Sequence, residues 1–141
     1  MNGPYAKEAL VITALRKYSH SHLSPLKIFK EHGGVFTAAT GKPDLEFIWN
    51  GVTMYMEVKR QDGKLTTNQI ATINEMRSCK ARVWVAKPNT KMEFYFRSPI
   101  PGGKIIELAA DISTKECWTD LFLGPDNEDV LRRVTYVSAL D

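Results

Sequence analysis

The sequence predicts a single α/β domain with a central mixed β-sheet flanked by helices. Residues 45–49 and 52–58 are short, largely apolar stretches joined by Asn50-Gly51, a dipeptide typical of tight β-hairpin turns. Apolar residues lie on both sides of this hairpin, as in a strand that is covered on both faces. A helical pattern then precedes an apolar strand at residues 82–86, and a helix between two strands usually makes them parallel.

Length and composition limit the other possibilities. A chain of 141 residues fits one domain with a real core, which we place at residues 1–141. No apolar run approaches the roughly 20 residues that a bilayer span needs, so no membrane association is expected. The two cysteines, Cys79 and Cys117, form neither a CxxC pair nor a Cys/His cluster. We therefore expect no zinc site or disulfide framework, and a cytoplasmic location (the host cytoplasm if the protein is viral).

The first helix is expected to start at Gly3-Pro4 and to run to about Tyr18. Val11, Ile12 and Leu15 follow Glu8 at helical spacing, so Glu8 shares the face that packs on the core. An acid in a first helical turn also complements the helix dipole. The pattern alone leaves both roles of Glu8 open.

The connector after this helix is less informative. His20 and His22 lie in a polar stretch, where two histidines without a further Cys or His are more often solvated than metal-bound. Residues 26–29 fit a short strand or part of a second helix. Residues 35–39 are expected to form a strand that approaches the hairpin.

Three charged residues gather at the end of the hairpin. Asp44 opens the first strand, and Glu57 and Lys59 point to the same face near the end of the second. Burying two carboxylates and an ammonium among apolar residues costs free energy, so we interpret them as holding a divalent metal and positioning a water. Oxygen ligands suit Mg²⁺ or Mn²⁺, and the Val58 carbonyl is a candidate third ligand. Lys59 can orient the water and stabilise developing charge, while its role as the formal base stays open.

The next helix has a complete structural signature. Thr66 and Gln69 have the spacing of a capping box, which by itself explains Gln69 without a functional role. Ile70, Ile73 and Met76 are expected to face the core. Beyond Pro88 the sequence predicts a strand at residues 92–96, an edge strand at 105–110, a helix at 113–123 capped by Ser113, and a short helix starting within 127–136.

Charge is distributed unevenly along the chain. Residues 1–100 carry 15 Lys and Arg against 8 Asp and Glu, whereas residues 101–141 carry 4 against 8. A cationic N-terminal part is typical of a polyanion-binding protein, although a solvated basic surface explains it equally well. Lys42, Arg60 and Lys64 lie close in sequence to the acidic residues and are the candidate nucleic-acid contacts.

The spacing of Pro43-Asp44, twelve residues, then Glu57-Val58-Lys59 resembles the PD-(D/E)xK nuclease superfamily. Here it is embedded in a longer series: KEHGG, G-x-P-D-L, E-V-K, a following glycine and L-T-x-x-Q. This series is similar to the VRR-NUC family, including its small stand-alone viral or phage members, and covers about residues 5–87. Ser78-Cys79-Lys80 departs from the pattern, because a glycine turn would be expected there.

The resemblance implies a restriction-endonuclease-like fold with the active site at the end of a β-hairpin, and metal-dependent cleavage of DNA. It implies metal binding by Asp44 and Glu57 and a catalytic role for Lys59. It places Glu8 beside the metal and Gln69 beside the catalytic residues. Stand-alone members are similar to Holliday-junction resolvases and tend to form homodimers. Residues 88–141 are not covered, and we expect them to complete the fold or to form a dimer surface.

We therefore predict a Mg²⁺-dependent endodeoxyribonuclease, with branched DNA as a candidate substrate. One alternative is a nucleic-acid-binding module of the same fold that is catalytically silent. Another is a purely structural domain in a larger viral assembly, which would leave the N-terminal positive charge without a purpose.

Overall fold

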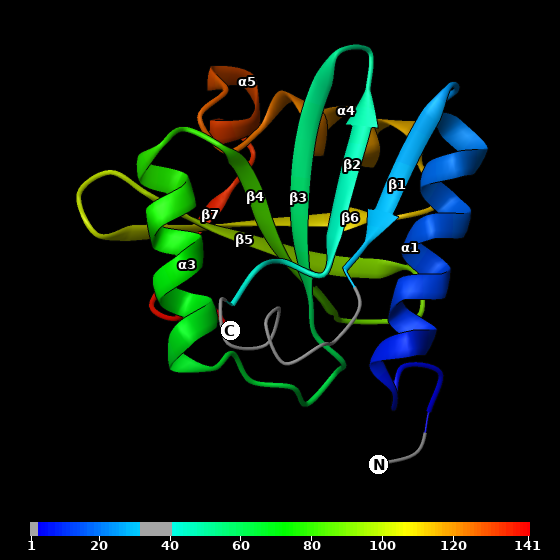
Figure 1. The fold of residues 1–141 in the computed structure, drawn as a ribbon, viewed down its shortest axis with the longest axis horizontal. Helices are drawn as coiled ribbons and strands as arrows, with labels where there is room; N and C mark the ends of the chain where they lie inside the picture. Colours follow the sequence, from blue (N-terminus) through cyan, green and yellow to red (C-terminus); the bar gives the residue numbers. More distant parts are fainter. Residues whose placement is uncertain (1–2, 32–40) are drawn as a thin grey trace.

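The hairpin predicted at Asn50-Gly51 is present and belongs to a mixed sheet of seven strands (Figure 1). The computed structural model describes residues 3–31 and 41–141. The strands lie in chain order in the sheet, and only β3 and β4 are parallel to each other. They are β1 (Leu26–Lys30), β2 (Leu45–Trp49), β3 (Val52–Val58), β4 (Arg82–Pro88), β5 (Glu93–Ile100), β6 (Lys104–Asp111) and β7 (Thr135–Val137).

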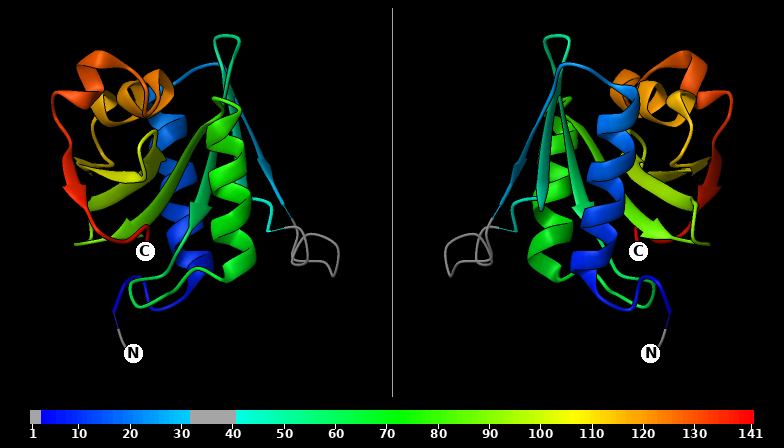
Figure 2. Two further views of the ribbon diagram at one scale, coloured as in Figure 1. Left: turned by 90° about the vertical axis from the view of Figure 1, so that its left-hand side faces the viewer. Right: turned by 90° about the vertical axis from the view of Figure 1, so that its right-hand side faces the viewer.

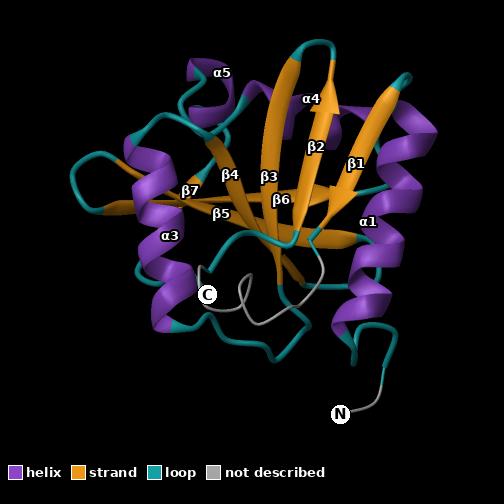
Figure 3. Cartoon of the chain, in the orientation of Figure 1, coloured by secondary structure: helices purple, strands orange, loops and turns teal. Residues whose placement is uncertain are grey.

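Helices flank this sheet, as the sequence predicts (Figures 2 and 3). On one side, α1 (Glu8–His22) and α4 (Lys115–Leu123) contact each other and β3. The short α5 (Glu128–Leu131) adds Val130 to the same core. On the other side, α3 (Thr67–Ser78) packs on β4 and β5. The α/β class with a central mixed sheet is therefore confirmed.

Alternation along β3 divides its side chains between the two layers. Met54, Met56 and Val58 are fully buried against the α1 and α4 side, in the core that also contains Trp84 and Trp118. Tyr55 instead packs with the smaller cluster under α3, whose buried members are Leu65, Ile73, Val83, Val85 and Leu140. Glu57 follows Tyr55 on this second face, so the face that carries the candidate site lies on the α3 side.

The predicted start of the first helix is wrong. The helix begins at Glu8, with Lys7 in an extended conformation as its N-cap residue, and it continues to His22. Tyr5 explains the late start, because its side chain is buried and its hydroxyl donates to the Lys91 carbonyl. This contact directs residues 3–7 across the end of the sheet instead of along a helix axis. His20 and His22 therefore lie in the last helical turn, not in a connector.

Three predictions in the C-terminal part also need correction. Residues 104–111 do not form an edge strand, because β7 pairs with β6 on its outer side. Thr114, not Ser113, caps α4 and accepts a hydrogen bond from the Cys117 N–H. The helix expected from residue 127 has only four residues before the chain turns toward β7.

Two uncertain segments have different outcomes. Residues 26–30 form a strand, whereas the strand expected at residues 35–39 lies outside the described residues. The turn after α3 forms without a glycine, because Lys80 itself adopts a left-handed conformation with φ of 67°. The departure from the family pattern at Ser78-Cys79-Lys80 therefore does not prevent the turn.

We expect Gly41→Ala to destabilise the protein more than Gly51→Ala, as measured by chemical denaturation. Both glycines have positive φ, where an alanine costs about 1–2 kcal/mol. A Cβ at Gly41 would also lie 2.6 Å from the Asn68 carbonyl oxygen, whereas a Cβ at Gly51 has no atom within 4 Å. Equal losses at the two positions would contradict the close approach of the Gly41 loop to α3.

Candidate active site

Asp44 joins the start of β2 to the end of β3. Its Oδ2 atom accepts a hydrogen bond of 2.8 Å from the Val58 backbone N–H. Its own carbonyl accepts from the Glu31 N–H at 2.8 Å, just beyond β1. The Asp44 carboxylate is thus fixed at the point where β1 and β3 end and β2 begins. Val58 is the last residue of β3, so its carbonyl belongs to the same end of the sheet.

Glu57 is unusual among the candidate residues, because its acidic side chain is only 1% exposed. Burial, and then the neighbouring Asp44 carboxyl, raises the pKa of Glu57 to about 10. Its Oε2 atom is buried, and no N–H or O–H group of the described residues donates to it. Within the described residues, Asp44 is the neighbouring carboxyl, and the two carboxyls can share a proton when no cation is bound.

Gln69 connects the two halves of the site. Its Oε1 atom accepts from the Lys59 ammonium at 3.1 Å, and its Nε2 atom donates to Glu57 Oε1 at 3.3 Å. The same Oε1 accepts from the Thr66 N–H at 2.9 Å, which completes the predicted capping box. The Gln69 side chain therefore caps α3 and at the same time contacts Glu57 and Lys59.

Lys59 is buried despite its charge, with a relative exposure of 7%. Its backbone N–H donates to the Ala86 carbonyl at 2.9 Å, which continues the parallel pairing of β3 with β4 by one residue. Gly63 lies against the side chain, since a Cβ there would approach Lys59 Cδ to 3.3 Å. The loop after β3 thus encloses the lysine stem and leaves its ammonium beside Gln69.

Glu8 reaches the site from α1, where it is the first helical residue. Burial, followed by the charge of Asp44, raises the pKa of Glu8, while Lys59, Arg60 and Lys30 act in the opposite direction. The charges of Asp44 and Lys59 therefore act on the Glu8 carboxyl. Its helical position also fits the dipole interpretation, so the two roles considered from the sequence are compatible.

The three candidate nucleic-acid contacts lie at the surface around this group. Lys42 forms an ion pair of 2.8 Å with Glu31, and Arg60 forms one of 3.0 Å with Asp62. Their side chains are about half exposed, and Lys64 is exposed as well. Exposed ion pairs contribute little stability, so an incoming phosphate can compete for these cations.

Sequence reasoning missed Lys87 and Asp141. Lys87 follows Ala86 in β4, and its ammonium donates to the Gly63 carbonyl at 3.3 Å. The prediction that β3 and β4 are parallel could have located it, because the carboxyl ends of parallel strands meet at one sheet edge. Asp141 accepts a hydrogen bond of 2.6 Å from the Leu65 N–H. No local signal in the sequence indicates that contact, which spans 76 residues.

The oxygen donors at this end of the sheet suit a hard cation. Asp44 and Glu57 supply two carboxylates, and the Val58 carbonyl lies at the same strand end. Mg²⁺ typically takes one or two carboxylates and keeps several waters, so this set fits it. Among residues 3–31 and 41–141, no group of three or more His, Cys, Asp or Glu side chains is arranged so that it could hold a metal ion, so the candidate set consists of two carboxylates and a backbone carbonyl. The unpaired Glu57 Oε2 is the observation that favours a cation here.

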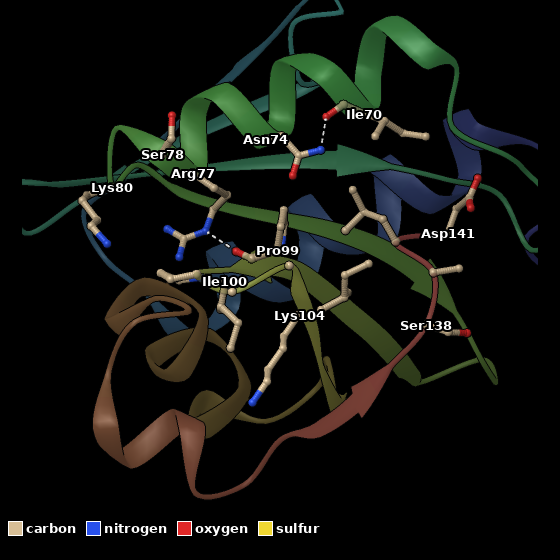
Figure 4. Close-up of a pocket in the computed structure, with 16 residues that line it drawn as sticks. Ile70, Asn74, Arg77, Ser78, Lys80, Pro99, Ile100, Lys104, Ser138 and Asp141 are labelled. Carbon is tan, nitrogen blue, oxygen red and sulfur yellow. Dashed lines mark hydrogen bonds between the residues drawn. The ribbon is translucent and has the colours of Figure 1, made fainter.

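A hollow in the described part of the chain lies elsewhere. It has a volume of about 750 Å³ and is lined by side chains along α3 from Ile70 to Ser78, by the β5–β6 turn and by residues 138–141 (Figure 4). Arg77 at its edge is already bound to Pro99, Ala81 and Asp126. The hollow and the carboxylate group are thus separate features that both adjoin α3.

None of the helices among the described residues has the length and apolar character needed to cross a membrane.

A comparison with solved structures finds several chains of similar fold. No protein-family model and no curated protein matches the sequence. Among solved structures, the chain is similar to Hjc, a Holliday junction resolvase from the archaeal hyperthermophile Archaeoglobus fulgidus. The TM-score is 0.44 at 16% sequence identity, over 89% of this chain and 95% of that chain. The assignment of this chain to the α/β class rests on its own sheet and helices.

The buried carboxyl pair predicts how the stability of the metal-free protein depends on pH. The pKa of Glu57 is raised in the folded state, so the folded protein holds a proton that the unfolded chain releases above its ordinary pKa of 4.5. The free energy of unfolding should therefore fall as the pH rises from about 5.5 to 8.5, by at most about 1.4 kcal/mol per pH unit from this group. Urea denaturation in EDTA measures this dependence.

Glu57→Gln should flatten this pH dependence, because the amide is uncharged and can donate to the Asp44 carboxylate. Glu75→Gln, at an exposed position of α3, is the matched control and should leave the slope unchanged. A slope that persists in Glu57→Gln would show that other groups cause it.

Proposed function

We propose that the protein is a metal-dependent endodeoxyribonuclease that hydrolyses phosphodiester bonds at the end of the β2–β3 hairpin. One observation carries the proposal: Glu57 has a buried carboxyl oxygen beside Asp44 to which no group of the described residues donates, and Gln69 links the same carboxyl to Lys59. A structural salt bridge would have paired Glu57 with a cation directly. The motif series supports assignment to the PD-(D/E)xK superfamily and, more finely, to proteins similar to the VRR-NUC family.

Each residue has a role that its contacts suggest. Asp44, Glu57 and the Val58 carbonyl would hold Mg²⁺ or Mn²⁺, with Glu8 beside them and able to bind through a water. The cation would supply Lewis acidity, which neutralises phosphate charge and activates water. The Lys59 ammonium is held at the site by Gln69, where it can orient the attacking water and stabilise negative charge as it develops. Gln69 fixes Lys59 and Glu57 relative to each other.

DNA binding is supported by the charge around the site. Lys42, Arg60 and Lys64 are exposed, and Lys87 lies beside the loop that follows β3. Cations placed in this way bind phosphates without regard to sequence. Selectivity would then depend on the shape of the substrate, and we propose branched DNA with a homodimer presenting two sites to two strands.

A second candidate is a DNA-binding module without catalysis. The burial of Glu57 and Lys59, at 1% and 7% exposure, favours this alternative, since a substrate must reach both groups. Asp44 is partly exposed and Arg60 is exposed, which favours an approach of the DNA from the open end of the hairpin, opposite the Asn50-Gly51 turn.

We expect the protein to cleave DNA with Mg²⁺ or Mn²⁺ and not with EDTA. Asp44→Asn, Glu57→Gln and Lys59→Met should each lower the cleavage rate by at least about 100-fold, because Asp44 and Glu57 would hold the metal and Lys59 would stabilise the negative charge of the transition state. Lys115→Ala, at an exposed position in the first turn of α4, is the control and should retain full activity. Gel assays on plasmid, linear, flap and four-way-junction DNA measure the rates.

Two results would contradict parts of this proposal. Tight binding without cleavage under every metal tested would favour the silent module. Cleavage that persists in Glu57→Gln and Lys59→Met would move the chemistry to another place on the protein.

The exposed cations should determine the salt dependence of DNA affinity. We expect Lys64→Ala to reduce the slope of log K against log salt concentration by about 1, because one phosphate contact is lost. Lys115→Ala should leave the slope unchanged. Fluorescence anisotropy in Ca²⁺, which should permit binding without turnover, makes the measurement. An unchanged slope for Lys64→Ala would exclude that residue from the DNA interface.

A further inference from the structure

Asp141 contacts the loop that connects β3 to α3. Its Oδ2 atom accepts a hydrogen bond of 2.6 Å from the Leu65 backbone N–H, across 76 positions of sequence. A carboxylate that binds a backbone N–H forms a charge-assisted bond, which is stronger than an ordinary one. Leu65 immediately precedes Thr66, the N-cap residue of α3. The contact therefore acts at the base of the capping box.

Hydrogen bonds continue from this loop to the two charged side chains of the site. The Thr66 N–H donates to Gln69 Oε1 at 2.9 Å, and the Gln69 N–H donates back to the Thr66 hydroxyl at 3.1 Å. Gln69 in turn binds the Lys59 ammonium and Glu57 Oε1. A displacement of Leu65 and Thr66 would thus move Gln69, and with it the hydrogen bonds that Gln69 forms with Lys59 and Glu57.

Two further contacts hold residues 138–141 in place. Arg97 Nη1 donates to the Ala139 carbonyl at 3.2 Å, and Arg97 is itself fixed by a 2.7 Å ion pair with Glu107. Leu140 is 6% exposed and packs in the cluster that contains Leu65. Leu65 is therefore held by Asp141 through its backbone and by the Leu140 cluster through its side chain.

The same segment borders the 750 Å³ hollow under α3. In Figure 4, Asp141 lies below the N-terminal end of the helix, near Ile70, whereas Ser138 lies farther along the segment. Because Ser138 and Ala139 are exposed beside this hollow, packing alone does not fix the segment. The hydrogen bonds at Ala139 and Asp141 therefore determine the path of residues 138–141.

We propose that Asp141 is a positioning residue for the active site and acts through Leu65 and Thr66 on Gln69. This inference rests on the proposed nuclease function for its consequence, and on the contacts above for its geometry. Within the described residues, Asp141 forms no hydrogen bond with Glu57 or Lys59 and acts on them through other residues, so it should affect the rate of the chemical step more than substrate binding. A purely stabilising contact would instead change the melting temperature alone.

Three variants test the proposal. Asp141→Ala removes the acceptor, Asp141→Asn keeps an oxygen that can accept from the Leu65 N–H, and Ser138→Ala changes an exposed residue of the same segment. For Asp141→Ala we expect amide exchange at Leu65 to accelerate at least about tenfold, because its hydrogen bond is lost. The side-chain amide resonance of Gln69 should also shift. With DNA and Mg²⁺, kcat should fall about tenfold or more at similar KM.

Asp141→Asn should restore the Gln69 resonance and most of kcat, and Ser138→Ala should match the unchanged protein. An unmoved Gln69 resonance in Asp141→Ala would overturn the proposal, and so would an unchanged kcat in a variant with fast exchange at Leu65. If the unchanged protein cleaves no DNA, the nuclease function fails. The Gln69 resonance then still decides whether Asp141 positions this side chain.

Discussion

The buried carboxyl of Glu57 is the constraint on which the site depends. Placing a second acid beside Asp44 at a position with 1% exposure raises the free energy of the ionised form, and this raises the Glu57 pKa. An ordinary core position would hold an apolar side chain at the end of β3. Retaining the acid there makes sense if a bound metal cation relieves the repulsion between the two carboxylates.

The sheet topology brings the required groups to one edge. The β2–β3 hairpin places Asp44 opposite the end of β3, and the parallel pairing of β3 with β4 brings Lys87 next to Lys59. Helix α3 then returns along the sheet with its N-terminus at the same edge, so the capping box supplies Gln69 to the site. One helix start therefore satisfies its own backbone and also connects Glu57 to Lys59.

Local signals in the sequence were sufficient for much of this arrangement. The Asn50-Gly51 turn fixes the hairpin register, and register fixes which face carries Glu57. The Thr66 capping box was recognised from spacing alone and is present in the structure. In each case the physical cause acts within a few residues, so the pattern contains the necessary information.

The failures involve contacts between distant parts of the chain. The first helix starts late because Tyr5 binds Lys91, and no pattern near Pro4 reveals that partner. The link from Asp141 to Leu65 was invisible for the same reason. Thr135–Val137 adds a strand to β6 although its own sequence is too short to identify one. Metal binding, DNA cleavage and dimer formation remain predictions, because they depend on partners beyond the chain.

Crystals of the protein soaked in Mn²⁺ test the central claim most directly, through the anomalous signal of the metal. We predict an anomalous difference peak within about 2.0–2.3 Å of one oxygen each from Asp44 and Glu57, with the Val58 carbonyl completing the protein ligands. The peak should be absent in Glu57→Gln. No peak at this position in well-ordered crystals, or a peak that persists without the Glu57 carboxylate, would contradict the account.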